Sequence, residues 1–176
     1  MVRPGGKKWG LVVVGGKTVS RGASMSSFIG TDVYAIDHKG RITVPPSMRR
    51  GEGRKPITRF VLNMGFDGCV AAYSPEEWKR VMEKLRRVSI GSETGRRFRR
   101  AFMTDAREVT VDAQGRIPVP PALIRRAGLG KEAVLHGAED HIEIWSPERF
   151  RSELASVVDV PGEYEKLAAE HLGEDS

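Results

Sequence analysis

The chain has 176 residues and a mass of 19.4 kDa, which suits one ordinary domain or two very small ones and excludes a large multidomain enzyme. Its 29 Lys and Arg residues against 23 Asp and Glu residues give a formal net charge of +6, and no apolar run approaches the ~18 residues that a membrane-spanning helix needs. The single Cys69 cannot form an intrachain disulfide, and four histidines without metal-ligand spacing argue against zinc, so we expect no cofactor and no membrane partner.

Residues 1–25 are expected to form a flexible leader. This glycine-rich stretch does not make a phosphate-binding loop, because the GxxxxGK[ST] motif would need glycine where Leu11 stands. Lys17 and Arg21 stand where a secretory signal would have its cleavage region, which argues against a signal peptide. Two interpretations stay open: a genuine N-terminal arm, or upstream DNA translated in error before a true start at Met25.

An internal repeat is the strongest signal in the chain. The sequence DHKGRITVPP at residues 37–46 returns as DAQGRIPVPP at residues 112–121, with seven of ten positions identical. The sequence YSPEEW at residues 73–78 likewise returns as WSPERF at residues 145–150. We infer that one structural unit occurs twice.

Each unit is predicted to begin with two short strands joined by a tight turn. The strands are expected at residues 33–36 and 42–44 in the first unit, and at 109–111 and 117–119 in the second. Between them lies Asp-x-x-Gly, in which the aspartate can accept backbone NH groups and the glycine can take positive φ. A Pro-Pro pair then ends the strand and opens a short helix that stops near Gly51 or Gly128.

A β-hairpin and a helix are predicted to complete each unit. The hairpin strands are expected at residues 59–63 and 69–73, and again at 133–136 and 141–145. Ser74 and Ser146, each followed by proline, are predicted N-caps of the closing helices.

These elements predict an α+β fold with pseudo-twofold symmetry. A unit of about 70 residues is marginal alone, so the two units are expected to share one core over residues 28–158, with paired or interleaved strands. We place the first repeat at 26–100, the second at 101–158 and an acidic C-terminal tail at 159–176. Pro118 cannot donate a ladder hydrogen bond, which predicts a sheet edge in the second unit.

Charge is separated along the chain. Residues 78–107 carry 10 basic and 3 acidic side chains, whereas residues 139–176 carry 3 basic and 11 acidic ones. Such a distribution suits a body that attracts polyanions and a tail that is solvated or tempers the attraction, although ordinary solvated helix faces would give the same pattern.

The duplicated DxxGR motif, each copy followed by an aliphatic strand and proline, resembles the MraZ family of bacterial transcriptional regulators. The resemblance covers roughly residues 26–158. It implies a duplicated AbrB-like fold of the swapped-hairpin or double-split β-α-β kind, and a ring-shaped homo-oligomer in the cytoplasm and nucleoid. It also implies binding to repeated TGGG-type boxes in double-stranded DNA of the chain's own promoter, upstream of the division and cell-wall gene cluster.

Carried onto this chain, the DxxGR motif of the family points to Asp37, Arg41, Asp112 and Arg116 as DNA contacts, and we add Lys39 and the turn glycines Gly40 and Gly115 as candidates. An arginine just after a glycine turn can present its fork to guanine O6 and N7 or to phosphate, and the aspartate can hold the fork or the turn in place. The alternative is a surface Asp-Arg pair that only stiffens the hairpin. Lys39 is expected to contact phosphate, and its counterpart Gln114 makes the units unequal.

The arginine-rich run at residues 96–100 is open to two interpretations. Phe98 and Phe102 share one helical face, so the aromatic rings are expected to anchor a helix whose arginines face a neighbouring subunit or DNA.

No enzymatic activity is predicted, because the sequence contains no recognisable nucleophile-base pair or metal set. The paired aspartates could suggest an aspartic-protease dyad, but each has an arginine four residues on, which favours ionisation of both. A ring-forming scaffold that binds a protein partner without specific DNA binding is the alternative function.

Overall fold

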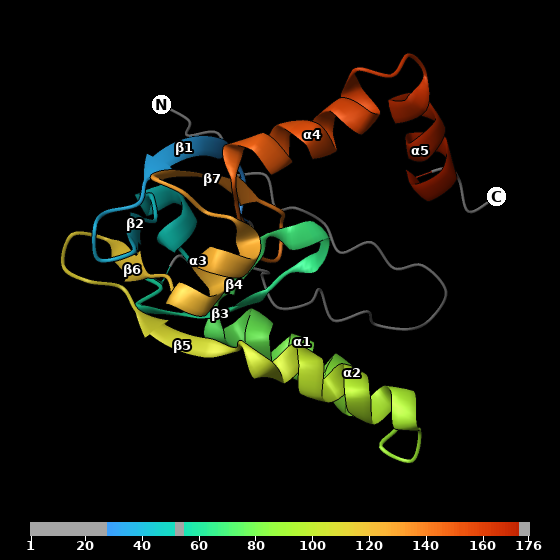
Figure 1. Cartoon of the computed structure of the whole chain (residues 1–176), viewed down its shortest axis with the longest axis horizontal. Helices are drawn as coiled ribbons and strands as arrows, with labels where there is room; N and C mark the ends of the chain where they lie inside the picture. Colours follow the sequence, from blue (N-terminus) through green and yellow to red (C-terminus); the bar gives the residue numbers. More distant parts are fainter. Residues whose placement is uncertain (1–27, 52–54, 173–176) are drawn as a thin grey trace, which may run out of the picture.

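The computed structural model describes residues 28–51 and 55–172, and its architecture is α+β (Figure 1). A six-stranded sheet has the order β1-β7-β8-β4-β3-β5, and a separate two-stranded ribbon pairs β2 with β6. The leader at residues 1–25, with its alternative start, lies outside the described residues.

Within the described residues, the first unit contributes four strands, two short 3-10 helices and a helical arm. Its elements are β1 (Thr31–Ala35), β2 (Arg41–Thr43), η1 (Pro46–Arg49), β3 (Arg59–Met64), η3 (Phe66–Gly68), β4 (Val70–Tyr73), α1 (Pro75–Arg86) and α2 (Glu93–Thr104). The second unit follows the same plan, with β5 (Arg107–Thr110), β6 (Arg116–Pro118), α3 (Pro121–Ala127), β7 (Glu132–Gly137), β8 (Ile142–Trp145), α4 (Pro147–Val158) and α5 (Glu163–Leu172).

The strands of the two units interleave. The equivalent strands of the two units are β1 and β5, β3 and β7, and β4 and β8. If each is exchanged for its equivalent, the same strand order is obtained, read from the opposite edge of the sheet, as a pseudo-twofold axis requires. The first strand of each unit pairs with the other unit, β1 with β7 and β5 with β3. This confirms the predicted duplicated α+β fold with strands shared between the units.

The predicted hairpin of residues 33–36 with 42–44 is wrong in one respect. Its two segments form an isolated bridge between Ile36 and Ile42 but no ladder, and the corresponding segments of the second unit form no ladder either, because β2 and β6 pair with each other. Pro118 lies on an edge, as predicted, and its nitrogen points away from β2 because the neighbouring Val119 NH bonds the carbonyl oxygen of Gly40. β2 is an edge of the same ribbon, so this feature does not distinguish the second unit.

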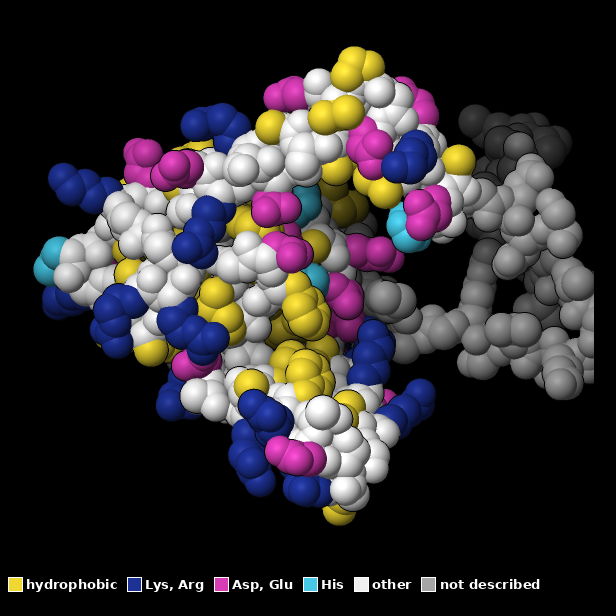
Figure 2. Space-filling model, turned by 45° about the vertical axis from the view of Figure 1, so that its right-hand side comes forward, with side chains coloured by type: hydrophobic (Ala, Val, Ile, Leu, Met, Phe, Trp, Pro, Cys, Tyr) yellow, Lys and Arg dark blue, Asp and Glu magenta, His cyan; other side chains and the backbone are white. Residues whose placement is uncertain are grey.

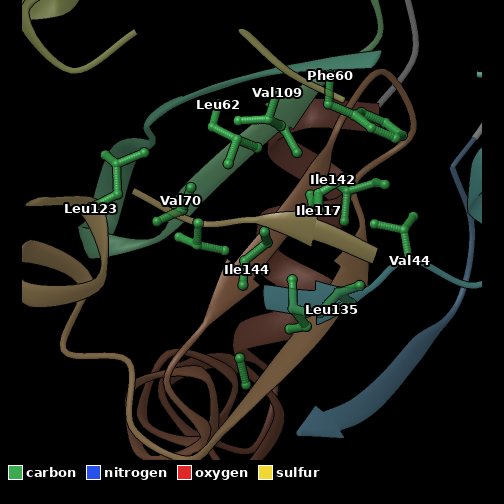
Figure 3. Packing of buried hydrophobic residues seen from close by; sticks show 14 of the residues in the cluster. Val44, Phe60, Leu62, Val70, Val109, Ile117, Leu123, Leu135, Ile142 and Ile144 are labelled. Carbon is green, nitrogen blue, oxygen red and sulfur yellow. The ribbon is translucent and has the colours of Figure 1, made fainter. Parts of the chain in front are cut away.

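One hydrophobic core lies between the ribbon and a face of the large sheet. Fully buried side chains from both units, among them Val44, Phe60, Ile117 and Ile144, gather in a single cluster (Figure 3). Along β3 the residues alternate, with Phe60 and Leu62 in this core, as the period of two in a strand requires. Neither unit could bury these side chains alone.

The helix ends follow the predicted local chemistry. Ser74 accepts the backbone NH of Glu77 and Ser146 accepts that of Arg149, so both predicted N-caps are confirmed. Gly128 takes the left-handed conformation, with φ of +63°, that ends α3.

The acidic C-terminal segment contains a helix whose residues are mostly exposed. The structure places α5 over Glu163–Leu172, joined to α4 by a turn at Gly162, and the two helices extend away from the sheet (Figure 1). The charge count alone gave no sign of this helix, although Leu167 and His171 follow Glu163 and Tyr164 at helical spacing.

Candidate nucleic-acid interface

The two DxxGR motifs form a matched pair of tight turns at one end of the molecule, where the β1-β2 and β5-β6 loops lie (Figure 1). In each turn the aspartate carbonyl accepts the glycine NH, at 2.8 Å from Gly40 to Asp37 and 2.9 Å from Gly115 to Asp112. The φ angles of the two glycines are +72° and +79°, a region that other residues rarely adopt.

Each aspartate holds both its turn and its arginine. One oxygen of Asp37 accepts the backbone NH groups of Lys39 and Arg41, each at 2.9 Å, and the other oxygen accepts Nε of Arg41 at 2.8 Å. Asp112 repeats this pattern with the backbone NH groups of Gln114 and Arg116 and with Nε of Arg116, all at 2.9 Å.

The ribbon brings the two motifs together. Because successive residues in a strand point to opposite faces, β2 and β6 bury Ile42 and Ile117 and turn their first residues, Arg41 and Arg116, outward. Nη1 of Arg116 lies 3.6 Å from Asp37, and Nη1 of Arg41 lies 3.9 Å from Asp112. We call these four residues, Asp37, Arg41, Asp112 and Arg116, the Asp-Arg quartet.

The quartet leaves part of each guanidinium uncommitted. Nε and Nη2 of each arginine contact the aspartate of its own turn, whereas Nη1 has no protein acceptor within hydrogen-bond distance in the described part of the chain. The four side chains are 25–33% exposed. Each arginine is thus oriented through one edge and retains donors that an outside acceptor can take.

The glycines also permit close packing between the units. A Cβ at Gly40 would lie 3.1 Å from Cδ1 of Ile124, and one at Gly115 would lie 2.9–3.2 Å from the guanidinium of Arg49. Arg49 itself donates from Nε to the carbonyl of Val44 at 2.8 Å. No sequence pattern points to Arg49, because only the fold brings η1 of one unit against the turn of the other.

Hydrogen bonds from the arginines lower the pKa of both aspartates. For Asp37 the side chain of Arg41 is the main cause, and for Asp112 the backbone NH of Arg116 comes first and its side chain second. Both carboxylates are therefore charged at neutral pH, as expected for arginine partners and contrary to a dyad that shares a proton.

The quartet makes stability depend on acid in a predictable way. A carboxylate whose pKa is lower in the folded than in the unfolded chain stabilises the fold above its unfolded pKa, which is about 3.9 for Asp. That contribution is lost as the pH falls from about 5 through 4 and toward the folded pKa. We expect the melting temperature, followed by circular dichroism, to drop over this range.

The variant Asp37→Asn/Asp112→Asn supplies the control for this acid effect. At neutral pH it should melt at a lower temperature than the parent. On acidification its melting temperature should fall less than that of the parent. An equally steep loss in the variant would show that other carboxylates cause the effect.

Comparison with known protein families assigns the chain. The family model of the MraZ protein, which its description calls antitoxin-like, matches residues 27–101 and again residues 102–160. The chain belongs to the MraZ family. The two matches reflect the internal repeat, and the resemblance inferred from the two DxxGR motifs is thereby confirmed.

Named relatives cover most of the chain. The transcriptional regulator MraZ of Clostridium acetobutylicum is 38% identical over 141 residues, which make up 80% of this chain and 96% of that protein. Proteins of the same name are 43% identical over 123 residues in Heliobacterium modesticaldum and 37% identical over 145 residues in Symbiobacterium thermophilum. They cover 70% and 82% of this chain, and 83% and 99% of their own lengths. These names describe regulators and not enzymes.

Lys39, in the first DxxGR loop, is the further positive side chain that we expect to contact DNA. It is exposed, as are its neighbour His38 and its counterpart Gln114, and its backbone NH is used by Asp37. The lysine ammonium is therefore open to solvent.

The arginine-rich run lies on α2, away from the loops. Phe102 stacks on Trp78 with ring centroids 6.1 Å apart and planes 9° apart, and Phe98 lies 5.9 Å from Phe102. Phe102 therefore anchors α2 to α1 as expected, whereas Phe98 contacts Phe102 within the same helix and is 44% exposed.

Other chemistry is limited in the described part of the chain. Burial raises the pKa of the Cys69 thiol to about 12, so this group is a poor nucleophile. Among the described residues, no group of three His, Cys, Asp or Glu side chains could hold a metal ion, and no helix is long and apolar enough to cross a membrane.

Proposed function

We propose that this MraZ family member is a transcriptional regulator that binds double-stranded DNA through its two DxxGR loops. The observation that supports this most is the Asp-Arg quartet, which fixes two guanidinium groups on the outer face of one short ribbon and leaves donors free on each. A preordered fork pays little conformational entropy on binding and suits the paired acceptors O6 and N7 of guanine.

The finer proposal concerns the DNA sequence. A guanine-rich box of the TGGG type offers the acceptor pattern that two adjacent arginine forks require. We propose that repeats of such boxes in the chain's own promoter, ahead of the division and cell-wall gene cluster, are the sites, and that the protein works in the cytoplasm at the nucleoid. We further propose that a ring-shaped homo-oligomer aligns several loop pairs with successive boxes, so that weak contacts add through effective concentration.

The direct test compares DNA duplexes of equal length by gel shift at fixed salt. A duplex with repeated TGGG boxes should bind more tightly than one with the same bases scrambled, and footprinting on the chain's own upstream region should map protection to the boxes. Equal affinity for both duplexes, with the oligomer intact, would instead favour the scaffold function that binds a protein partner.

Substitution of Lys39 should change how DNA affinity depends on salt. If its ammonium neutralises one phosphate, Lys39→Gln should reduce the slope of log affinity against log salt by about 0.9 per chain, without changing the preference between duplexes. Gln114→Lys is the matched variant, because it installs the same group in the second unit and should steepen the slope by a similar amount. Fluorescence anisotropy over a range of salt concentrations measures both, and an unchanged slope in Lys39→Gln would remove this residue from the interface.

A further inference from the structure

Two helical arms project from the same side of the molecule and carry opposite charge. The α1-α2 arm, residues 75–104, has nine basic and four acidic side chains, whereas the α4-α5 arm, residues 147–172, has six acidic and three basic ones. In Figure 2 dark blue side chains surround the lower arm, magenta and yellow ones mark the upper arm, and a hollow lies between them.

In the described part of the chain, the ring contacts between the acidic arm and the body lie at the base of the arm. Phe150 lies in the first turn of α4, and the centroid of its ring is 6.1 Å from that of Trp145 and 5.4 Å from that of His136. Beyond that turn the arm leaves large apolar side chains in solvent: Leu154, Val158, Val160, Tyr164 and Leu172 are 46–83% exposed. A cavity of about 420 Å³ opens at its elbow, between Val157 and Tyr164.

The basic arm also has exposed apolar side chains. Ile90, Phe98 and Met103 are 42–66% exposed. Met103 also lines a shallow depression of about 160 Å³, together with Arg86 and Arg99. Within the described residues, Arg86, Arg99 and Arg100 have no carboxylate partner.

Both arms therefore combine unpartnered apolar side chains with uncompensated charge, and the charges are complementary. Isolated apolar side chains at a surface are ordinary, but a contiguous set bordered by polar groups marks an interaction site. Complementary charge selects which surfaces meet.

We infer that the acidic α4-α5 arm of one copy docks on the basic α1-α2 arm of the next. The contact joins two different surfaces, so each copy keeps one free arm of each kind and the contact propagates until it closes on itself. This assigns the arginine-rich run to a subunit interface and leaves the DxxGR loops, at the other end of the molecule, free for DNA. The inference names the surfaces for the self-association in the proposed function and does not depend on DNA contact.

Charge reversal on each arm tests the assignment in the full-length chain without DNA. The basic-arm variant is Arg99→Glu/Arg100→Glu, and the acidic-arm variant is Glu165→Lys/Glu170→Lys. In either variant alone, the two arms that meet at the contact carry charge of the same sign. The mass measured by light scattering should therefore fall from that of the parent oligomer toward the 19.4 kDa monomer. An equimolar mixture restores opposite charges at both kinds of contact and should recover the parent mass with the variants in equal amounts. Lys131→Glu, on the far side of the molecule from both arms, should leave the mass unchanged.

Carbodiimide cross-linking of the unaltered protein is a second test that needs no variant to fold. In a mixture of isotope-labelled and unlabelled chains, bonds should join carboxylates of α5 to Lys79 or Lys84 of another copy. A monomeric parent would contradict self-association itself. An oligomer that survives both reversals, or cross-links that map only elsewhere, would contradict these surfaces while leaving self-association and DNA binding by the loops intact.

Discussion

Removing both loop arginines, as Arg41→Ala/Arg116→Ala, is expected to abolish the preference for guanine boxes. Each bidentate contact to a base contributes about 1–3 kcal/mol of discrimination, so loss of two weakens specific binding by at least about thirtyfold. Asp37 and Asp112 each lie near both arginines, so the two sites are coupled. The double variant should therefore lose more affinity for the boxed duplex than either single variant. Gel-shift titration against boxed and scrambled duplexes measures the change.

The matched control separates charge from geometry. Arg41→Lys/Arg116→Lys keeps both positive charges but lacks the planar fork, so it should retain attraction to any duplex and lose the preference for boxes. Arg59→Ala, which removes an exposed arginine paired with Glu108 on the large sheet, should leave the preference unchanged. If the double alanine variant keeps its full preference while remaining folded, the quartet only stiffens the ribbon, and DNA contact must be sought elsewhere.

Local chemistry explains what could be predicted from the sequence. The turn at Asp37 and the caps at Ser74 and Ser146 depend on residues within four positions, and each has the structure its residue types favour. The repeat of the DxxGR motif likewise indicated that two equivalent loops exist. The symmetry implied that they share a core.

The sharing of strands between the units could be predicted, but not which strands pair or in which register. The pairing of β2 with β6 joins strands 75 residues apart, and only that register brings Asp37 within 3.6 Å of Arg116. The contact of Arg49 with the turn at Gly115 has the same origin. The charge count also did not reveal the helix α5 over residues 163–172, although most of its residues are exposed, as expected for a solvated tail.

The ribbon at the centre of the fold should be the most sensitive site for stability. Ile42 and Ile117 lie opposite each other in β2 and β6, and both are completely buried. Truncating either to alanine, Ile42→Ala or Ile117→Ala, removes apolar contacts and leaves a cavity, for an expected loss of about 2–5 kcal/mol in the free energy of unfolding. Val33→Ala, at a side chain 58% exposed on β1, should cost under about 0.5 kcal/mol. Urea denaturation followed by tryptophan fluorescence and by circular dichroism measures all three.

The two isoleucines also test whether the units fold as one. Since they come from different repeats and contact the same core, either truncation should shift a single transition detected identically by both probes, and the double variant should depart from the sum of the singles. Two separate transitions, with each truncation lowering only its own, would contradict a shared core. In that case the quartet above the ribbon would join two independently folded halves, and the spacing of its arginines would no longer be fixed by the fold.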